Sequence, residues 1–455
     1  MERRQKNKPT GRRQVALGIL VLVLLPQLAT AAKPPNILFI YLDDFGWRDT
    51  GYMGSDFYET PHIDALAKRG LVFSDAYSCA ANCAPARGCL LSGQYTPRHE
   101  IFNVGTRPRG KAKNRLLAHI PGTATLRPEI VTWAESLQTA GYRTGMFGKW
   151  HLGTTPRAQG FDVSVDHRRL PGFKGHRGPD GAYLADVLTD RCIDFIEASK
   201  DRRWCAYLAH FAVHTPLHAK RELLPKYQKK KPGKLHKHVK MATMIQAVDD
   251  GVGKLIARLE ALDLLDDTVI IFYSDNGGYG PATDMDPLWG YKGTYYEGGI
   301  RVPFFVNWPG VVKAGKTSEP ITGVDLYPTL LGIADAKRPD QVLDGVNLVP
   351  LFKGEVDGLD ERPLFWHFPA YLQSYQVTHE QRDPLFRTRP CSVIRKGRFK
   401  LHEYFEDGAL ELYDLSDDIR ERDNLADRMP DKRDELHRLL KDWRDKIGAP
   451  VPERK

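Results

Sequence analysis

Apolar runs that alternate with helical patterns dominate the first three hundred residues of the chain. Continuous apolar stretches of this kind are typical of strands buried on both faces of a parallel sheet, and apolar residues at helical spacing separate them. The pattern therefore predicts an α/β fold. The predicted strands are Asn36–Leu42, one within Gly141–His151, Cys205–Phe211 and Thr268–Tyr273, and the predicted helices cover residues 60–70, 83–93, 130–141, 184–196 and 241–262.

Two of these helices carry further expectations. Thr60 followed by Pro61 predicts a capped helix start, and Gly70 marks its end. The long helix over 241–262 has an amphipathic stripe, and Asp249 and Asp250 are expected on its polar face.

The last hundred residues follow a different pattern. A polar, turn-rich segment at 350–362 precedes four short strand-like pieces and a helix from about Asp431. We expect a domain boundary there, with a catalytic domain over 32–357 and a small α+β subdomain over 358–455 that carries an antiparallel sheet. The strand-like pieces are 364–368, 392–395, 398–402 and 410–414.

The first 31 residues resemble an export signal. A polar, basic start precedes an uncharged apolar run over 15–25 and the small residues Ala29-Thr30-Ala31. The run is too short for a comfortable membrane span, so we expect no stable span and a periplasmic or secreted protein. An uncleaved anchor remains the alternative.

Composition and charge narrow the class of protein. With 42% hydrophobic and 27% charged residues, the chain is an ordinary globular sequence and neither a disordered nor a fibrous one. Its net charge is +9, but residues 1–31 hold six Lys or Arg and one Glu, which leaves about +4 on the exported part. That charge is too small to argue for a nucleic acid partner.

Polar side chains follow two of the predicted strands directly. Asp43-Asp44 and Asp275-Asn276 lie at strand ends, where open α/β sheets place their ligands. Adjacent carboxylates need a cation, and an all-oxygen set suits Ca²⁺ or Mg²⁺ better than zinc. The alternative interpretation of Asp43-Asp44 is a helix cap or turn pair.

Cys83 starts the stretch Cys83-Ala84-Pro85-Ala86-Arg87, which runs into Leu90-Leu91-Ser92-Gly93. Proline near the front of a short apolar segment that ends in glycine predicts a helix with Cys83 at its positive end, and Arg87 adds a permanent cation. The stretch is therefore suited to an anion. Disulfide or metal-ligand roles for Cys79, Cys83 and Cys89 stay open, although their spacing differs from the Cys-x-x-Cys of zinc sites.

Cys-x-Pro-x-Arg followed by Leu-Leu-Ser-Gly resembles the type I, formylglycine-dependent sulfatases of the alkaline phosphatase superfamily, with Ala86 where serine is usual. Gly141–His151 resembles the second signature of that family, His214-Thr215-Pro216 its His-x-Pro, and Lys292 its lysine-bearing loop. The resemblance spans roughly residues 34–430. It implies an arylsulfatase-like enzyme with a large mixed, mainly parallel sheet and a small C-terminal subdomain.

The same resemblance implies a mechanism. Cys83 is oxidised by a formylglycine-generating enzyme, and one hydroxyl of the aldehyde hydrate attacks sulfur beside Ca²⁺ or Mg²⁺. His151 takes the proton from the second hydroxyl, and sulfate leaves. The implied catalytic residues are Cys83, Arg87, Lys149, His151, His214 and Lys292, and the implied metal ligands are Asp43, Asp44, Cys83, Asp275 and Asn276.

The expected substrate is a sulfate monoester, and export favours a sulfated carbohydrate. The Arg-, His- and Gly-rich segment 166–179 suits a substrate-facing loop or a plain exposed one. Three alternatives remain: a phosphodiesterase or phosphonate monoester hydrolase of the same superfamily, an inactive sulfatase-like carbohydrate-binding protein whose Cys83 is never oxidised, and a disulfide-stapled structural protein.

Overall fold

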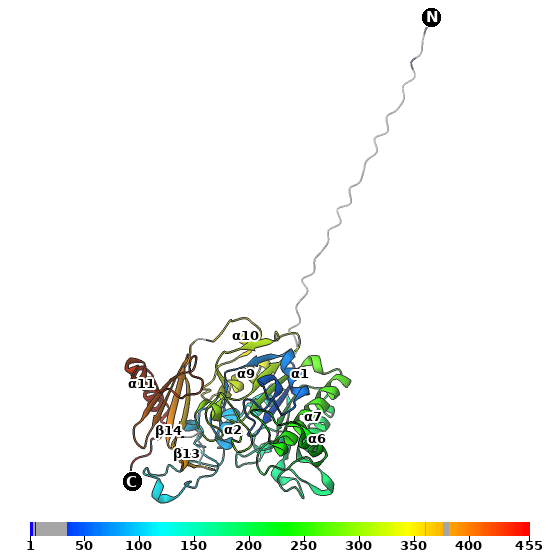
Figure 1. Cartoon of the computed structure of the whole chain (residues 1–455). Helices are drawn as coiled ribbons and strands as arrows, with labels where there is room; N and C mark the ends of the chain where they lie inside the picture. Colours follow the sequence, from blue (N-terminus) through cyan, green and yellow to red (C-terminus); the bar gives the residue numbers. More distant parts are fainter. Residues whose placement is uncertain (3–4, 6–33, 360, 376–381) are drawn as a thin grey trace. The chain divides into compact units, whose positions relative to one another are not determined.

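The computed structural model describes residues 1–2, 5, 34–359, 361–375 and 382–455 (Figure 1). The predicted export signal lies outside these residues, apart from Met1, Glu2 and Gln5. No helix in the described part of the chain is both long and apolar enough to cross a bilayer.

The central sheet has eight strands in the order β5-β4-β6-β1-β7-β8-β2-β9. All neighbouring strands are parallel except that β8 runs antiparallel to β7 and β2. The prediction of a mixed, mainly parallel sheet is confirmed. The strands are β1 Asn36–Leu42, β2 Leu71–Phe73, β4 Arg143–Gly148, β5 Val163–Asp166, β6 Trp204–Ala209, β7 Thr268–Ser274, β8 Phe304–Asn307 and β9 Gly315–Thr317.

Helices cover both faces of this sheet because β1 alternates its fully buried side chains between two cores. Phe39 and Tyr41 pack with one core, which takes in α4 Trp133–Thr139, α9 Leu326–Ala334 and α10 Val349–Phe352. Leu38 and Ile40 pack with the other, which takes in α1 Pro61–Arg69, α5 Leu184–Glu197 and α7 Val239–Ala261. Shorter elements complete this part of the chain: β3 Ala76–Tyr77, β10 Ile321–Thr322, α2 Cys83–Ser92, α3 Thr96–His99, α6 Leu224–Lys229 and α8 Glu297–Ile300.

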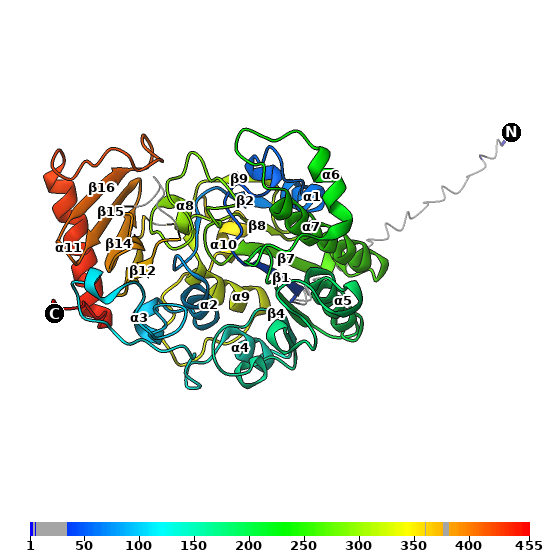
Figure 2. The ribbon, with the colours of Figure 1, turned by 60° about the horizontal axis from the view of Figure 1, so that its bottom comes forward.

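A second, antiparallel sheet follows near the C-terminus, as predicted. Its order is β11-β14-β15-β16, and the long helix α11 Pro430–Ile447 lies along it (Figure 2). The ring of Trp443 stacks on Phe365 at a centroid distance of 4.5 Å. The predicted boundary at residues 357/358 stays a prediction. The strands are β11 Leu364–Phe368, β14 Cys391–Lys396, β15 Phe399–Tyr404 and β16 Leu410–Asp414, with a separate pair β12 Leu372–Gln373 and β13 Phe386–Thr388.

Buried ion pairs connect the C-terminal sheet to the catalytic part. Lys400 of β15 is fully buried, with its Nζ 2.8 Å from Glu297 Oε1 and 2.9 Å from Glu421 Oε1. The backbone N–H of Glu297 also donates to Glu421 Oε2 over 2.6 Å. These contacts fix the segment that follows Lys292.

The start of α1 corrects two sequence expectations. The Thr60 side chain makes no capping hydrogen bond. Instead Asp249 of α7, expected on a polar face, is fully buried and accepts from the backbone N–H of His62 at 3.3 Å and of Ile63 at 2.8 Å. A carboxylate at this position satisfies amides that a helix start leaves open and complements the helix dipole.

Candidate active site

The predicted site residues that follow strands meet at one edge of the central sheet. Leu42 pairs with Ser274, so Asp43-Asp44 and Asp275-Asn276 leave β1 and β7 at the same level. Tyr41 and Gly148 are both in register with Ala209, so β4 and β6 end there too and deliver Lys149, His151 and His214. Parallel strands therefore bring distant parts of the sequence to one place.

The carboxylate pair forms the floor of the site together with β7. Asp44 adopts a left-handed backbone conformation (φ 60°), and its N–H donates to Asp275 Oδ1 at 3.1 Å. Asn276 Nδ2 donates to Asp44 Oδ1 at 2.8 Å. Asp43, Asp44, Asp275 and Asn276 are all at most 1% exposed. Three carboxyl groups thus share one desolvated volume.

Three buried cations neutralise these carboxyl groups. Lys149 pairs with Asp43, and Lys292 Nζ lies 2.7 Å from Asp44 Oδ2. Arg87 forms a fork on Asp275 Oδ2, with Nε at 3.2 Å and Nη2 at 2.9 Å. Burial opposes ionisation of Asp43, but Lys149 and the other nearby cations outweigh it and hold the pKa of Asp43 well below its usual range.

Arg87 also helps to position its neighbours. Its Nη1 donates to the backbone carbonyl of Lys149 at 2.9 Å, and its guanidinium lies 4.9 Å from the centroid of the Tyr41 ring. One buried arginine therefore connects α2 with the ends of β1, β4 and β7.

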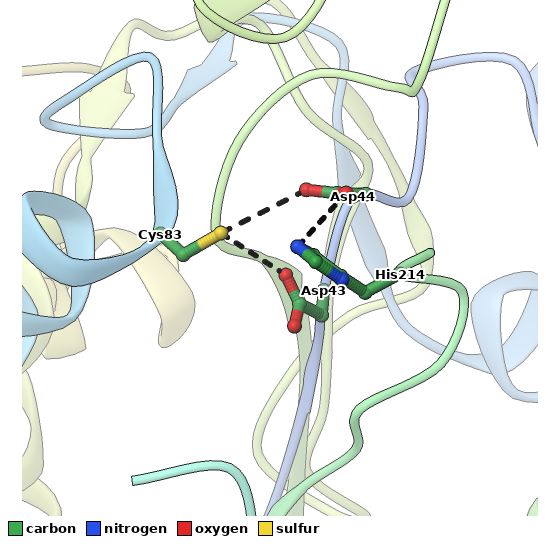
Figure 3. A group of neighbouring side chains, drawn as sticks. All are labelled: Asp43, Asp44, Cys83 and His214. Atoms are coloured by element: carbon green, nitrogen blue, oxygen red, sulfur yellow. Dashed lines mark hydrogen bonds and ion pairs between the residues drawn. The ribbon is translucent and has the colours of Figure 1, made fainter. Parts of the chain in front are cut away.

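Cys83 is the first residue of α2, as predicted, and it faces the carboxylates (Figure 3). Its Sγ lies 3.3 Å from Asp43 Oδ1, 3.9 Å from Asp44 Oδ1 and 3.3 Å from Lys292 Nζ. Burial and the neighbouring Asp43 raise the pKa of the thiol to about 12. As a cysteine, this side chain is neutral near pH 7 and a poor nucleophile.

All six cysteines are buried free thiols, so the disulfide interpretations of Cys79, Cys83 and Cys89 are wrong for this structure. Cys89 instead lies with its Sγ 3.3 Å from His99 Nε2, and Cys79 with its Sγ 3.3 Å from Thr322 Oγ1.

Two histidines complete the site. Burial and Lys149 lower the pKa of His151 to about 2, so its imidazole is neutral. Its Nδ1 is buried and has no hydrogen-bond partner in the described part of the chain. His214 donates from Nδ1 to the carbonyl of Thr215 over 2.6 Å and presents Nε2 to Asp44 Oδ2 at 3.8 Å (Figure 3).

The oxygen donors of this site suit a hard cation. Asp43, Asp44, Cys83 and His214 each place a donor atom within 4.8 Å of the others. Asn276 Oδ1, beside them, is buried without a hydrogen-bond partner among the described residues. A buried carbonyl oxygen needs a partner, and carboxylate and amide oxygens are the ligands that Ca²⁺ and Mg²⁺ prefer. The candidate ligands Asp275 and Asn276 lie against Asp44 through the hydrogen bonds above.

A cavity of about 330 Å³ opens over Cys83. Lys149, His151, His214 and Lys292 line it, so the residues predicted from four separate segments surround one hollow. A larger hollow of about 610 Å³ beside β5 and α5 contains none of the predicted catalytic or metal-binding residues, although Asp166, Arg169 and Leu170 of the segment 166–179 line it.

Sequence reasoning missed part of this cavity. Arg109 and Arg387 line it, and both come from segments without a recognisable pattern. Arg168 lines it too and belongs to the segment 166–179 that composition marked as a candidate substrate loop. An excess of arginine was the only local signal for these residues.

Two family models match this chain. The family model described as Sulfatase matches residues 35–336, and the one described as N-sulphoglucosamine sulphohydrolase, C-terminal, matches residues 288–446.

Individual relatives extend the match over most of the chain. A protein named Sulfatase from Formosa agariphila is 31% identical over 534 residues, covering 96% of this chain and 94% of the relative. The N-acetylgalactosamine-6-sulfatase of Homo sapiens is 30% identical over 377 residues, covering 74% and 69%. The crystal structure of Ps i-CgsB in complex with k-i-k-neocarrahexaose is 29% identical with a TM-score of 0.74, covering 90% and 93%.

Proposed function

This chain belongs to the sulfatase family and is a sulfuric ester hydrolase, and from that premise we propose that it removes sulfate from a carbohydrate by means of an aldehyde formed from Cys83. The proposal includes a calcium or magnesium ion bound beside the aldehyde. The mature enzyme is exported, and a formylglycine-generating enzyme oxidises Cys83 before it works.

The placement of Cys83 carries this proposal. Its Sγ is 3.3 Å from both a carboxylate oxygen and an ammonium nitrogen, at the start of a helix and under the cavity. The raised pKa argues against the thiol itself as nucleophile, because only the thiolate attacks efficiently. An oxidised side chain removes that difficulty.

The aldehyde hydrate would supply one hydroxyl as nucleophile and a second whose proton must be taken away. His151 is the base in this proposal, since its imidazole is neutral and lines the cavity together with Cys83. Lys149 and Arg87 hold the hydrate and the sulfate. His214 and Lys292 also bind the sulfate, and they give a proton to the leaving alcohol.

Asp43, Asp44, Asp275 and Asn276, with the modified residue 83, would hold the cation. A bound Ca²⁺ or Mg²⁺ would supply positive charge that stabilises negative charge on the reacting oxygens. Asn276 Oδ1, to which no described residue donates a hydrogen bond, supports this assignment independently of the carboxylates.

A carbohydrate substrate is supported by the relatives. One is named N-acetylgalactosamine-6-sulfatase, and another was crystallised in complex with k-i-k-neocarrahexaose. The cations that line the cavity suit a sulfated ligand.

Mass spectrometry of the peptide that contains Cys83 tests the modification. In protein from a host with the maturation enzyme, we expect the aldehyde form, and its fraction should track the sulfate released. An unmodified thiol in fully active protein would refute the proposal.

Relative rates test the substrate class. We expect sulfate release from sulfated saccharides to exceed hydrolysis of a phosphodiester such as bis(4-nitrophenyl) phosphate. Faster hydrolysis of the phosphodiester would assign the chain to the phosphodiesterase alternative instead.

A further inference from the structure

Positive charge is in excess around the cavity over Cys83. The described residues that line it include five lysines and arginines and no aspartate or glutamate: Arg109, Lys149, Arg168, Lys292 and Arg387. The two lysines are paired with Asp43 and Asp44 on the floor. The three arginines make no ion pair with any carboxylate in the described part of the chain.

Arg387 is the clearest case because it is only 5% exposed. Its Nε donates to the carbonyl of Gln373 at 3.0 Å and its Nη1 to the carbonyl of Lys292 at 3.2 Å. Its guanidinium also lies 3.6 Å from the centroid of the Tyr375 ring. These neutral partners orient the guanidinium at the cavity wall without neutralising it.

The other two arginines approach from separate loops. Arg109 donates from Nη2 to the carbonyl of Val104 at 2.8 Å, again a neutral partner. Arg168 is exposed, and its charge is close enough to His151 to contribute to the lowered pKa of that imidazole. Three chain segments therefore each bring one cation to the same hollow, and none of the three is within ion-pair distance of a described carboxylate, although the charge of Arg168 helps to lower the pKa of Asp166.

A single sulfate ester cannot use all this charge. It carries one negative charge, whereas three arginines line the cavity beyond Lys149, Lys292 and Arg87, which are paired with Asp43, Asp44 and Asp275. Arginine has a planar fork that binds an oxyanion through two hydrogen bonds, and a buried guanidinium without a counter-ion costs free energy until an anion arrives. The arrangement thus calls for further negative charge on the ligand.

We infer that Arg109, Arg168 and Arg387 form a second anion-binding subsite, so that the enzyme selects saccharides with another sulfate or carboxylate close to the ester it cleaves. This inference rests on the proposed function and narrows its substrate class. Each arginine is a specificity residue that contacts the second anionic group.

A further hollow, different from the one beside β5 and α5, adjoins the cavity and gives such a saccharide room. It measures about 550 Å³ and shares Gln373 and Tyr375 with the cavity. A sugar next to the one whose sulfate ester is cleaved can extend in this direction past the ring of Tyr375. The guanidinium of Arg387 lies against that ring.

The test compares sulfate release from two matched pairs of substrates. N-acetylgalactosamine monosulfate against its disulfate places the second group on the same ring. The monosulfated against the disulfated carrageenan disaccharide places it on the neighbouring ring. For at least one pair, we expect kcat/KM to be about tenfold or more higher for the disulfated sugar, because a charge-assisted hydrogen bond contributes this much.

Arg168→Gln and Arg387→Gln should each reduce that preference several-fold. Arg202→Gln is the matched control, since Arg202 is exposed at the amino end of β6, away from the cavity, and should leave the preference as it is. If Arg387→Gln disturbs Lys292 and lowers kcat/KM equally for the mono- and disulfated sugars, the preference measured with Arg168→Gln decides whether the second subsite exists.

Each negative result overturns a different claim. Equal kcat/KM for the mono- and disulfated sugars, or an unchanged preference in both variants, overturns the second subsite and leaves the sulfatase assignment intact. No sulfate release from any of the sugars by aldehyde-bearing protein overturns the proposed carbohydrate substrate and this inference with it.

Discussion

Removal of the divalent cation should weaken the binding of inorganic sulfate, because the site is otherwise electrically balanced. Three buried carboxyl groups face three buried cations, with ion-pair distances between 2.5 and 3.2 Å where Lys292 and Arg87 take part. Burial and the neighbouring Asp43 raise the pKa of Asp275 to about 7, so the six charges cancel fully only above that pH. Without a metal, the two lysines are held by Asp43 and Asp44 and are less available to an anion.

A bound Ca²⁺ adds two positive charges and competes with both lysines for the carboxylates. Two unit charges 4 Å apart interact by about 4 kcal/mol at an effective dielectric constant of 20. If half of this survives rearrangement, the gain for sulfate is about 2 kcal/mol, or roughly thirtyfold in Kd. Thermodynamic linkage requires sulfate to tighten Ca²⁺ binding by the same factor.

Isothermal titration calorimetry on protein with unmodified Cys83 measures both sides of this coupling. Sulfate is titrated with Ca²⁺ present and again with a chelator, and Ca²⁺ is titrated with and without sulfate. Asp44→Asn should weaken Ca²⁺ binding and shrink the coupling. A sulfate Kd that is the same with and without Ca²⁺ would refute the charge argument, even if the metal binds.

Three further outcomes are expected. Cys83→Ala should abolish sulfate release while the melting temperature changes little, since only one buried sulfur atom is lost. Lys400→Met should lower the free energy of unfolding by about 3–5 kcal/mol, because two buried glutamates lose their shared cation; thermal unfolding measures it. His437 and Arg444 outweigh burial and lower the pKa of Glu403 to about 2. The ionised Glu403 carboxylate therefore stabilises the fold fully above the usual glutamate pKa near 4.5, and this stabilisation is lost as the pH falls toward 2. Glu403→Gln should remove this pH dependence, which amounts to about 1–2 kcal/mol in the free energy of unfolding after allowance for solvent screening.

Each of these outcomes has a control. Lys200→Met changes an exposed lysine and should leave thermal unfolding as it is, whereas an equal loss in both lysine variants would contradict the buried-pair argument. Full sulfate release by Cys83→Ala would exclude residue 83 as the nucleophile. A stability profile between pH 2 and 4.5 that is identical in wild type and Glu403→Gln would contradict the assigned pKa.

Much of the fold follows from local sequence pattern. The apolar run Asn36–Leu42 is a strand with those limits, and Cys83 is the first residue of its helix, as predicted. Buried strands and amphipathic helices leave a strong signal because their side chains meet the core at a fixed repeat. The antiparallel strand β8 and the short strands β2 and β9 left no such signal, since each has only three or four residues.

The sequence by itself determined which residue types leave the strand ends, because parallel strands point their carboxyl ends to one edge of a sheet. Only the tertiary structure decided what those residues touch. Asp249 caps a helix 186 residues away from it in sequence, and Arg387 reaches the cavity from the C-terminal part of the chain. Such contacts depend on how whole layers pack, and neither periodicity nor composition encodes the distance between two side chains so far apart in sequence.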